Sequence, residues 1–341
     1  MVRNCRFTLS IMTAICGTLL SVDSIQAGLG LPFGHSSDCC ESRSACDLNQ
    51  VFCNPCPTFT SNVKFVYMQR TQTGNGAIVA NSNTNQVLLK GDQYDFGFQP
   101  GIDTNLIYHL NPTTGVEFRY LWIDEWSESA FTPNPNPGAL RYLTNPVTGD
   151  FGADFASEYT SSLQTAEINL RKQAGNITWL VGFRWAEIDE NLQVNGLPPV
   201  LQSFTSFNTS NNLYGLQVGL EAPLYSRGRF SLDTFGKLGW YANQVEGDSQ
   251  LILGNAVLGQ AHDSRTDPAL LAEAGLEGVY HINQFVALRL GYQLFLAHGI
   301  AVAPEQVKRT GSLVTNPSTL NLDTTDSLFA HGITGGLEFT W

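Results

Sequence analysis

The sequence has little charge, little lysine and no long apolar run beyond its N-terminal region. Only 14% of the 341 residues are charged, against about 25% in an average soluble domain. Acidic residues outnumber basic ones 30 to 18, giving a net charge of −12. A nucleic-acid partner is therefore excluded, because it needs a basic surface. No later segment is apolar enough for a membrane-spanning helix, so the protein can be embedded in a membrane only as a β-barrel.

Cysteine is absent from most of the chain. Beyond the N-terminal region all cysteines lie within eighteen residues, at Cys39, Cys40, Cys46, Cys53 and Cys56. In an exported protein such a cluster predicts disulfides. The odd number leaves one thiol free or paired with another chain. A metal site or redox activity at the Cys53 and Cys56 pair is a weaker alternative, since no second CxxC pair exists. We predict neither a metal nor a cofactor.

Familiar catalytic motifs are also lacking. The chain has no GxSxG, no HExxH and no phosphate loop, and we predict that it is not an enzyme. One enzymatic alternative is an omptin-like hydrolase, which needs a histidine beside a carboxylate and a second carboxylate pair across a cleft. Its candidate residues are His262 and Asp263 with Asp248 or Asp267, and the pairs Asp189–Glu190 and Asp124–Glu125.

The chain divides into three parts. Residues 1–27 combine Arg3 and Arg6 with an apolar stretch and a small-residue cleavage site, which is typical of a signal peptide. Residues 28–61 are a cysteine-rich segment, expected in the periplasm or as a plug. Residues 62–341 form the predicted barrel.

The last fifteen residues alternate between a mostly apolar face and a face of small, polar or charged side chains. Ile333, Leu337, Phe339 and Trp341 share one face, and small or polar residues occupy the other. This period of two indicates a half-buried strand. An aromatic last residue is frequent in the closing strand of outer-membrane barrels. We therefore interpret Phe339 and Trp341 as a signal to the barrel-assembly machinery.

The same alternation recurs along the chain and predicts about ten strands. Short turns are expected near residues 111–115, 173–176, 225–228 and 281–284. Long loops are expected near residues 71–92, 130–156, 193–208, 247–266 and 301–325. Short and long connections alternate, as in bacterial outer-membrane barrels. The fold predicted is all-β: an antiparallel, up-and-down transmembrane β-barrel. Twelve strands are an alternative if residues 73–92 pair.

Charged residues recur in the middle of the polar strand faces, next to Gly, Ala and Ser. They are Glu117, Arg119, Glu167, Arg171, Arg184, Asp233, Lys237, Glu273, Glu277 and Arg289. Their opposite signs predict a lumen filled with paired charges. The opposing faces carry Leu, Val, Phe, Tyr and Trp, which suit contact with membrane lipid.

The chain resembles the planctomycete outer-membrane β-barrel family called beta-barrel porin-7. The resemblance lies in the signal peptide, the cysteine-rich head, the long alternating strands, and stretches such as residues 94–98 (YDFGF) and 335–341 (GGLEFTW). It covers roughly residues 63–341. It implies an outer-membrane barrel and suggests a porin, and it brings no catalytic residues.

Ten strands enclose little space, since about eight already give a lumen filled by side chains. We therefore expect a structural protein or a narrow, porin-like pore in the outer membrane. Alternatives are the omptin-like enzyme or an adhesion or binding barrel acting through its long loops. The expected partners are outer-membrane lipid and the assembly machinery. The sequence does not give the oligomeric state.

Overall fold

A computed structural model describes residues 57–71, 74–81, 84, 86–133, 140–142, 154–197, 203–310 and 319–341. The predicted signal peptide and all five clustered cysteines lie outside these residues. The disulfide prediction therefore stays a prediction, as do the boundaries at residues 27 and 61.

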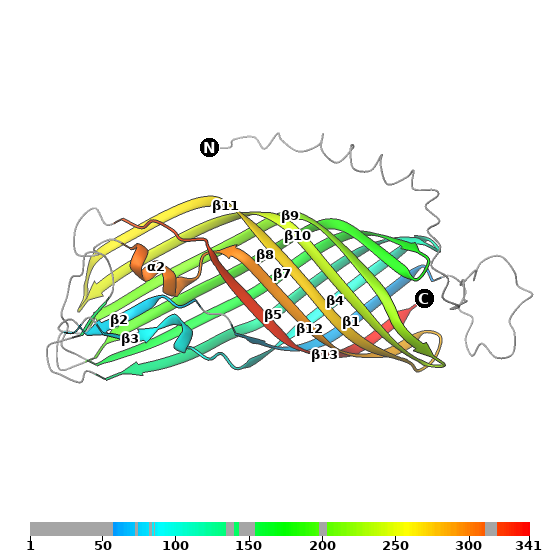
Figure 1. Cartoon of the computed structure of the whole chain (residues 1–341), viewed down its shortest axis with the longest axis horizontal. Coiled ribbons are helices and arrows are strands. Elements are labelled where there is room, and N and C mark those ends of the chain that lie inside the picture. Colours follow the sequence, from blue (N-terminus) through cyan, green and yellow to red (C-terminus); the bar gives the residue numbers. More distant parts are fainter. Residues whose placement is uncertain are drawn as a thin grey trace, which may run out of the picture. The chain divides into compact units, whose positions relative to one another are not determined.

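Ten antiparallel strands close into a barrel within the described residues (Figure 1). They are β1 (Phe59–Arg70), β4 (Phe98–Asn111), β5 (Thr114–Thr132), β7 (Phe155–Ala174), β8 (Ile177–Gly196), β9 (Ser203–Arg227), β10 (Phe230–Leu253), β11 (Ala256–His281), β12 (Val286–Ile300) and β13 (Asp326–Thr340). Each pairs with its neighbours in the chain, and β1 pairs with β13 to close the ring. The predicted up-and-down barrel is confirmed.

All four predicted short turns are present, and they lie at one end of the barrel. The turns between β7 and β8 and between β9 and β10 contain Gly175 and Gly228, whose φ angles are 63° and 61°. Tight hairpins require such left-handed positions, and glycine adopts them without strain. The chain's C-terminus lies at this end, which we call the short-turn end (Figure 1). The opposite end is the long-loop end.

Two predicted long loops are wrong. Residues 247–266 belong to a continuous hairpin in which β10 and β11 pair up to Leu253 and Ala256, with Gly254 in the turn. Most of residues 193–208 likewise belongs to β8 and β9. Both strand pairs extend well beyond a membrane, since about 9–11 residues per strand suffice to span one. Parts of these extensions, such as residues 246–250 of β10 and 259–266 of β11, carry small or polar side chains on both faces, which hid the strand pattern.

The other long connections fold back on the barrel. β2 (Ala77–Asn81) pairs with β3 (Val87–Lys90) and with β6 (Leu140–Tyr142) in a separate three-stranded sheet. The twelve-stranded alternative is therefore wrong. The connection between β12 and β13 contains the short helix α2 (Ala303–Arg309), which contacts β2, β8 and β9. No helix among the described residues is long and apolar enough to cross a membrane.

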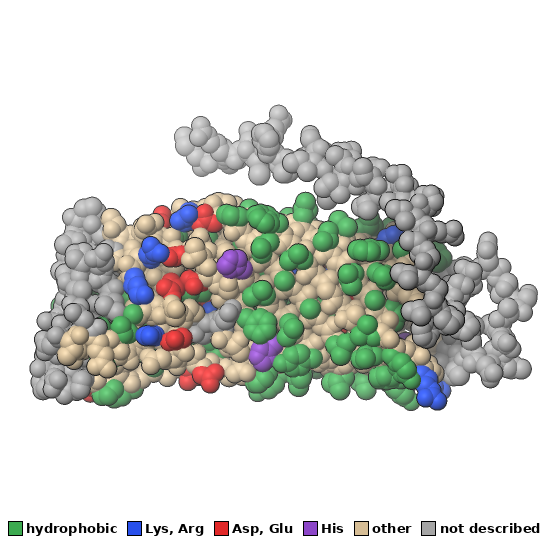
Figure 2. All heavy atoms as spheres, viewed as in Figure 1, with side chains coloured by type: hydrophobic (Ala, Val, Ile, Leu, Met, Phe, Trp, Pro, Cys, Tyr) green, Lys and Arg blue, Asp and Glu red, His purple; other side chains and the backbone are tan. Residues whose placement is uncertain are grey.

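Towards the short-turn end, the strands present apolar side chains outward. On β8, the outward Ile177, Trp179 and Phe183 are exposed, whereas Arg184, the residue after Phe183, points inward and is buried. The visible face in Figure 2 shows hydrophobic side chains over this part of the barrel, with charged side chains gathered towards the long-loop end. We call this outward apolar zone the apolar belt. It matches the lipid-facing band of a membrane barrel.

The pattern inverts along the same strands towards the long-loop end. On β8, Ile188, Leu192 and Val194 point inward and are fully buried, while Glu187 and Asp189 lie on the outward face. The inward apolar residues pack against β2, β3 and α2 in one core cluster. β8 therefore has two halves of opposite polarity, and beside it the interior changes from charged to apolar along the barrel.

Candidate functional site

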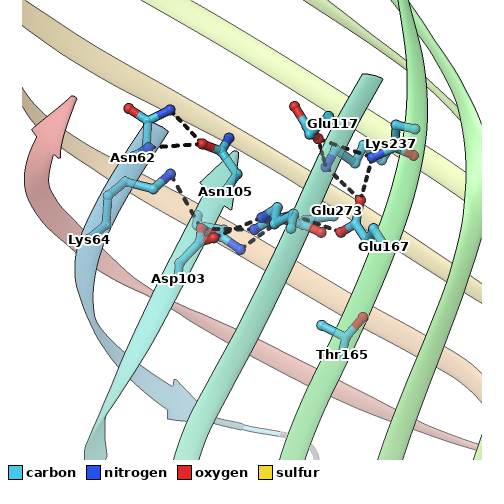
Figure 3. Close-up of polar contacts among 12 residues, drawn as sticks. Asn62, Lys64, Asp103, Asn105, Glu117, Thr165, Glu167, Lys237 and Glu273 are labelled. Atoms are coloured by element: carbon cyan, nitrogen blue, oxygen red, sulfur yellow. Dashed lines mark hydrogen bonds and ion pairs between the residues drawn. The ribbon is translucent and has the colours of Figure 1, made fainter. Parts of the chain in front are cut away.

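The interior at the level of the apolar belt is occupied by a network of ion pairs, the charge cluster. Its side chains come from separate strands and point into one space (Figure 3). The cations are Lys64, Arg119, Arg171, Arg184, Lys237 and Arg289, and the carboxylates are Asp103, Glu117, Glu167, Glu221, Glu273, Glu277 and Glu338. Strand alternation places them all inside the closed ring.

Arg119 is the centre of this cluster. Its guanidinium binds Asp103 in a bidentate geometry, with N–O distances of 2.9 and 3.0 Å. It also contacts Glu167 at 3.0 Å and Glu273 at 2.6 Å. β5, which carries Arg119, lies opposite β11, which carries Glu273, in the ring of ten strands. The pair therefore spans the full width of the barrel.

Other ion pairs cross the interior at nearby levels. Lys64 on β1 lies 2.7 Å from Glu277 on β11. Lys237 on β10 lies 2.8 Å from Glu167 on β7, and Arg184 on β8 lies 2.9 Å from Glu273. Because these bridges join strands that are not neighbours, the side chains fill the lumen rather than lining an open channel.

Uncharged side chains complete the hydrogen bonding of the cluster. Asn169 donates to Glu117 and Glu167 at 3.0 Å each, and Gln217 donates to Glu167 at 2.6 Å. Buried charges are stable only when they are paired and hydrogen-bonded. Removing a single partner is therefore costly, whereas the complete network adds more to specificity than to stability.

Nine of the ten charged residues singled out from the sequence enter these ion pairs. Asp233 is the exception: it lines the cavity beside the cluster and forms no ion pair within the described residues. Sequence reasoning left out four members, namely Lys64, Asp103, Glu221 and Glu338. The sequence did contain a signal that these four residues point into the lumen: in the alternation of apolar and polar side chains, all four lie on the polar face of their strand.

A cavity of about 350 Å³ leads from the short-turn end to the cluster. It is lined by charged side chains that include Arg171, Asp233 and Arg289. Arg171 pairs with Glu117 and Glu221 at its wall. The charge cluster forms the inner limit of this cavity. Solvent and small solutes from the short-turn end thus reach the paired charges, which restrict passage beyond them.

A second, apolar closure lies beyond the charge cluster. The described residues of the segment 74–97, together with the segment 300–310, fold into the barrel interior and bury Ile78, Phe96, Val302 and Val307 completely. We call them the plug. Phe96 lies just before β4, which begins at Phe98, and its side chain is inside. A Cβ at Gly76 would lie 2.4 Å from the Pro304 carbonyl oxygen, so the two segments touch backbone to backbone.

Polar anchors fasten the plug to the barrel wall. Glu190 pairs with Arg70 at 2.7 Å, and its other oxygen accepts hydrogen bonds from the Tyr159 hydroxyl and the Ala303 amide. Asn211 accepts from the Ala301 amide at 2.8 Å and donates to the Ala301 carbonyl at 2.9 Å. These contacts hold the turn before α2 in one position.

The residues considered for an omptin-like enzyme are not assembled as that chemistry requires. His262 lies 2.8 Å from Asp248, but the pair is more than half exposed on the outward wall of β10 and β11. Glu190 is a buried anchor of the plug, and Asp267 binds Arg265 and Thr324. Glu125, Asp189 and Glu190 line a hollow that shares Asp248 with the hollow lined by His262, so these candidates lie side by side on one wall of the barrel. The described residues also contain no group of three or more metal-ligating side chains suited to a metal ion.

The closing strand brings its terminal aromatics to the seam of the barrel. The Trp341 carbonyl accepts hydrogen bonds from the amides of Thr58 and Phe59, and its indole stacks on the Phe59 ring at 5.9 Å. Phe339 is outward and exposed on the apolar belt. The final residues of the chain thus help to join β13 to β1, where the barrel closes.

Residues 132–341 match the model of the family described as "Putative beta barrel porin-7 (BBP7)". The match covers more than half of the 341 residues. The chain belongs to this family. The resemblance seen in the sequence is confirmed over this range, and the chain is a porin-like β-barrel of the outer membrane. No curated protein matches the chain.

Solved structures of outer-membrane proteins that match this member of the beta barrel porin-7 family share little sequence with it. The outer-membrane protease OmpT of Escherichia coli is 9% identical, covers 83% of this chain and 96% of its own, and has a TM-score of 0.45. The translocator domain of the autotransporter NalP of Neisseria meningitidis is 8% identical, covers 85% and 91%, and has a TM-score of 0.39.

Proposed function

We propose that this protein is a non-catalytic outer-membrane barrel that is closed to solutes in the conformation described here. The observation that carries this proposal is the double closure of the lumen. Ion pairs span the barrel between opposite strands, and the plug fills the interior beyond them. Structural support of the outer membrane, with at most a narrow conductance, fits this arrangement better than free diffusion through a pore.

Conduction in this arrangement requires both closures to open. Moving the plug alone leaves Arg119 and its partners across the lumen, and loosening the charge cluster alone leaves the apolar plug in place. The signal peptide, the disulfides, the planctomycete origin and recognition by the assembly machinery remain our predictions. The interior location of the charged residues supports a structural role for them.

The test is single-channel recording in planar bilayers with heat-modifiable, full-chain protein. We expect the wild type to be silent. Asn211→Ala weakens the plug anchor. The pair Arg119→Ala with Asp103→Ala removes every ion pair of Arg119, including its bridge to Glu273 across the lumen, and leaves the net charge of the chain unchanged. We expect each change alone to leave the barrel silent or nearly so, and the combination to conduct. Steady openings of the wild type would refute the closed barrel.

A further inference from the structure

Beyond the apolar belt, five neighbouring strands carry an unbroken polar surface on the outside of the barrel. On each strand, four successive outward residues are polar; they lie within residues 158–164 of β7, 187–193 of β8, 206–212 of β9, 244–250 of β10 and 260–266 of β11. Strand pairing joins them into rows, one of which runs from Thr160 through Asn191, Asn208 and Asp248 to His262. We call this surface the outer polar face.

The outer polar face carries neutral and acidic side chains but no lysine or arginine. Its positions hold Ser, Thr, Asn, Gln, Asp and Glu with one histidine, and none of them holds Lys or Arg. Phosphate and other anionic headgroups are recognised mainly by Arg and Lys. Amides, hydroxyls and carboxylates instead suit a neutral ligand rich in hydroxyl groups, which both donates and accepts hydrogen bonds.

The face is hollowed where its rows meet. Two shallow hollows of about 270 Å³ each lie side by side and share Asn208 and Asp248 in their walls. The Asn208 side-chain oxygen is shielded and has no hydrogen-bond partner among the described residues. Asn191 lines the first hollow, and its side chain likewise bonds to no described residue. The hollows therefore offer polar groups that the chain itself leaves unused.

The position of the outer polar face next to the apolar belt indicates which molecules contact it. On β8 and β9 the outward Trp185 and Tyr214 pair across the strands and are followed at once by Glu187 and Asn212. Interfacial Trp and Tyr mark the level of the lipid headgroups. The outer polar face is thus continuous with the lipid-contacting belt, on the side of the long loops, which point out of the cell in such barrels. Headgroups of outer-leaflet lipids lie directly against it.

We propose that the outer polar face binds the uncharged saccharide headgroups of outer-leaflet glycolipids, with the hollows around Asn191 and Asn208 as the principal contacts. The outer polar face extends over seven residues along each strand, or roughly 20 Å. This length accommodates a headgroup of several sugars. The neighbouring Trp185 and Tyr214 give the first sugar an aromatic boundary. This inference holds whether or not the lumen conducts.

The test measures lipid binding to the full-chain protein in neutral detergent by native mass spectrometry. The probes are digalactosyldiacylglycerol, which has an uncharged sugar headgroup, and phosphatidylglycerol with the same acyl chains. We expect tighter binding of the galactolipid, and a roughly tenfold loss on Asn191→Ala with Asn208→Ala, since two hydrogen bonds contribute about 0.5–1.5 kcal/mol each. The control pair Gln173→Ala with Asn176→Ala, at the short-turn end, should bind as the wild type does.

Three results would overturn the proposal. Equal binding of the two lipids would show that the face does not distinguish a sugar headgroup from an anionic one. Equal losses in the two double variants would remove the assignment to the hollows, provided that both variants remain heat-modifiable. Dimers that dissociate on Asn208→Ala, without any change in lipid binding, would make the face a contact between two copies of the chain.

Discussion

Leu290 tests which face of the strands meets the lipid. It lies on β12, and 66% of its side chain is exposed on the outside, between the outward Leu288 and Tyr292. Arginine at this position would carry its charge into the hydrocarbon layer. In membrane barrels this costs about 2–4 kcal/mol near the midplane, so Leu290→Arg should lower the folding equilibrium by about thirtyfold to a thousandfold.

The assay is reversible folding into lipid vesicles, followed by tryptophan fluorescence in a denaturant titration. Thr178→Arg is the matched control, because Thr178 faces the cavity and stands opposite Glu221 across the strands. An arginine there remains in water and gains a carboxylate partner, so its effect should stay below about 1 kcal/mol. If the two variants lose the same stability, the assignment of the strand faces is wrong.

Three further changes probe the interior, the seam and the mouth. Glu167→Gln should cost about 3–5 kcal/mol in the same titration, because it removes the buried carboxylate that Arg119, Arg184 and Lys237 share; a loss under 1 kcal/mol would contradict the network. Trp341→Ala should lower the yield of heat-modifiable protein in the outer membrane, since the stack on Phe59 closes the seam, and an unchanged yield would argue against it. Burial beside Glu305 raises the pKa of Asp326, at the long-loop end of β13, to about 7. Its pKa in the unfolded chain is near 4, so stability should fall as the pH rises from about 4 to 7 and then level off. Asp326→Asn should remove this slope, and a slope that persists would assign it to another group.

The sequence predicts the half of each strand that lies in the membrane. There, alternation of apolar and polar side chains is clear, because lipid outside and charges inside select opposite residue types. In the outer half of β10 the outward Gln244 and Glu246 meet water, while the inward Gly247 and Ser249 pack against loop residues such as Leu322. Over residues 243–250 both faces are small or polar apart from Val245, and the alternation that identifies a strand is weak.

The charge cluster could be predicted as a set of residues but not as a set of partners. Alternation places Arg119 and Glu273 inside, yet 154 positions separate them in the chain. Their contact follows only from the ring of ten strands, which sets β5 opposite β11. The plug was beyond prediction for a similar reason. Its two segments are short and show no regular alternation of apolar and polar residues. They contact each other although more than 200 residues separate them in the chain.

The inversion of polarity along the strands argues that the closed barrel is the ground state. On β8 the outward apolar stretch runs from Ile177 to Trp185, roughly 26 Å along the strand, which falls within the length of about 9–11 residues that a tilted strand needs to span a bilayer. The inner walls of β7 and β8 beyond that level are largely apolar, and they pack against the plug. Exposing even four residues of these walls, such as Leu163, Ile188, Leu192 and Val194, would cost roughly 6–12 kcal/mol, at about 1.5–3 kcal/mol for each side chain. A wall built for an open pore would carry polar residues at these positions, so any opening must depend on a partner or force that offsets this cost.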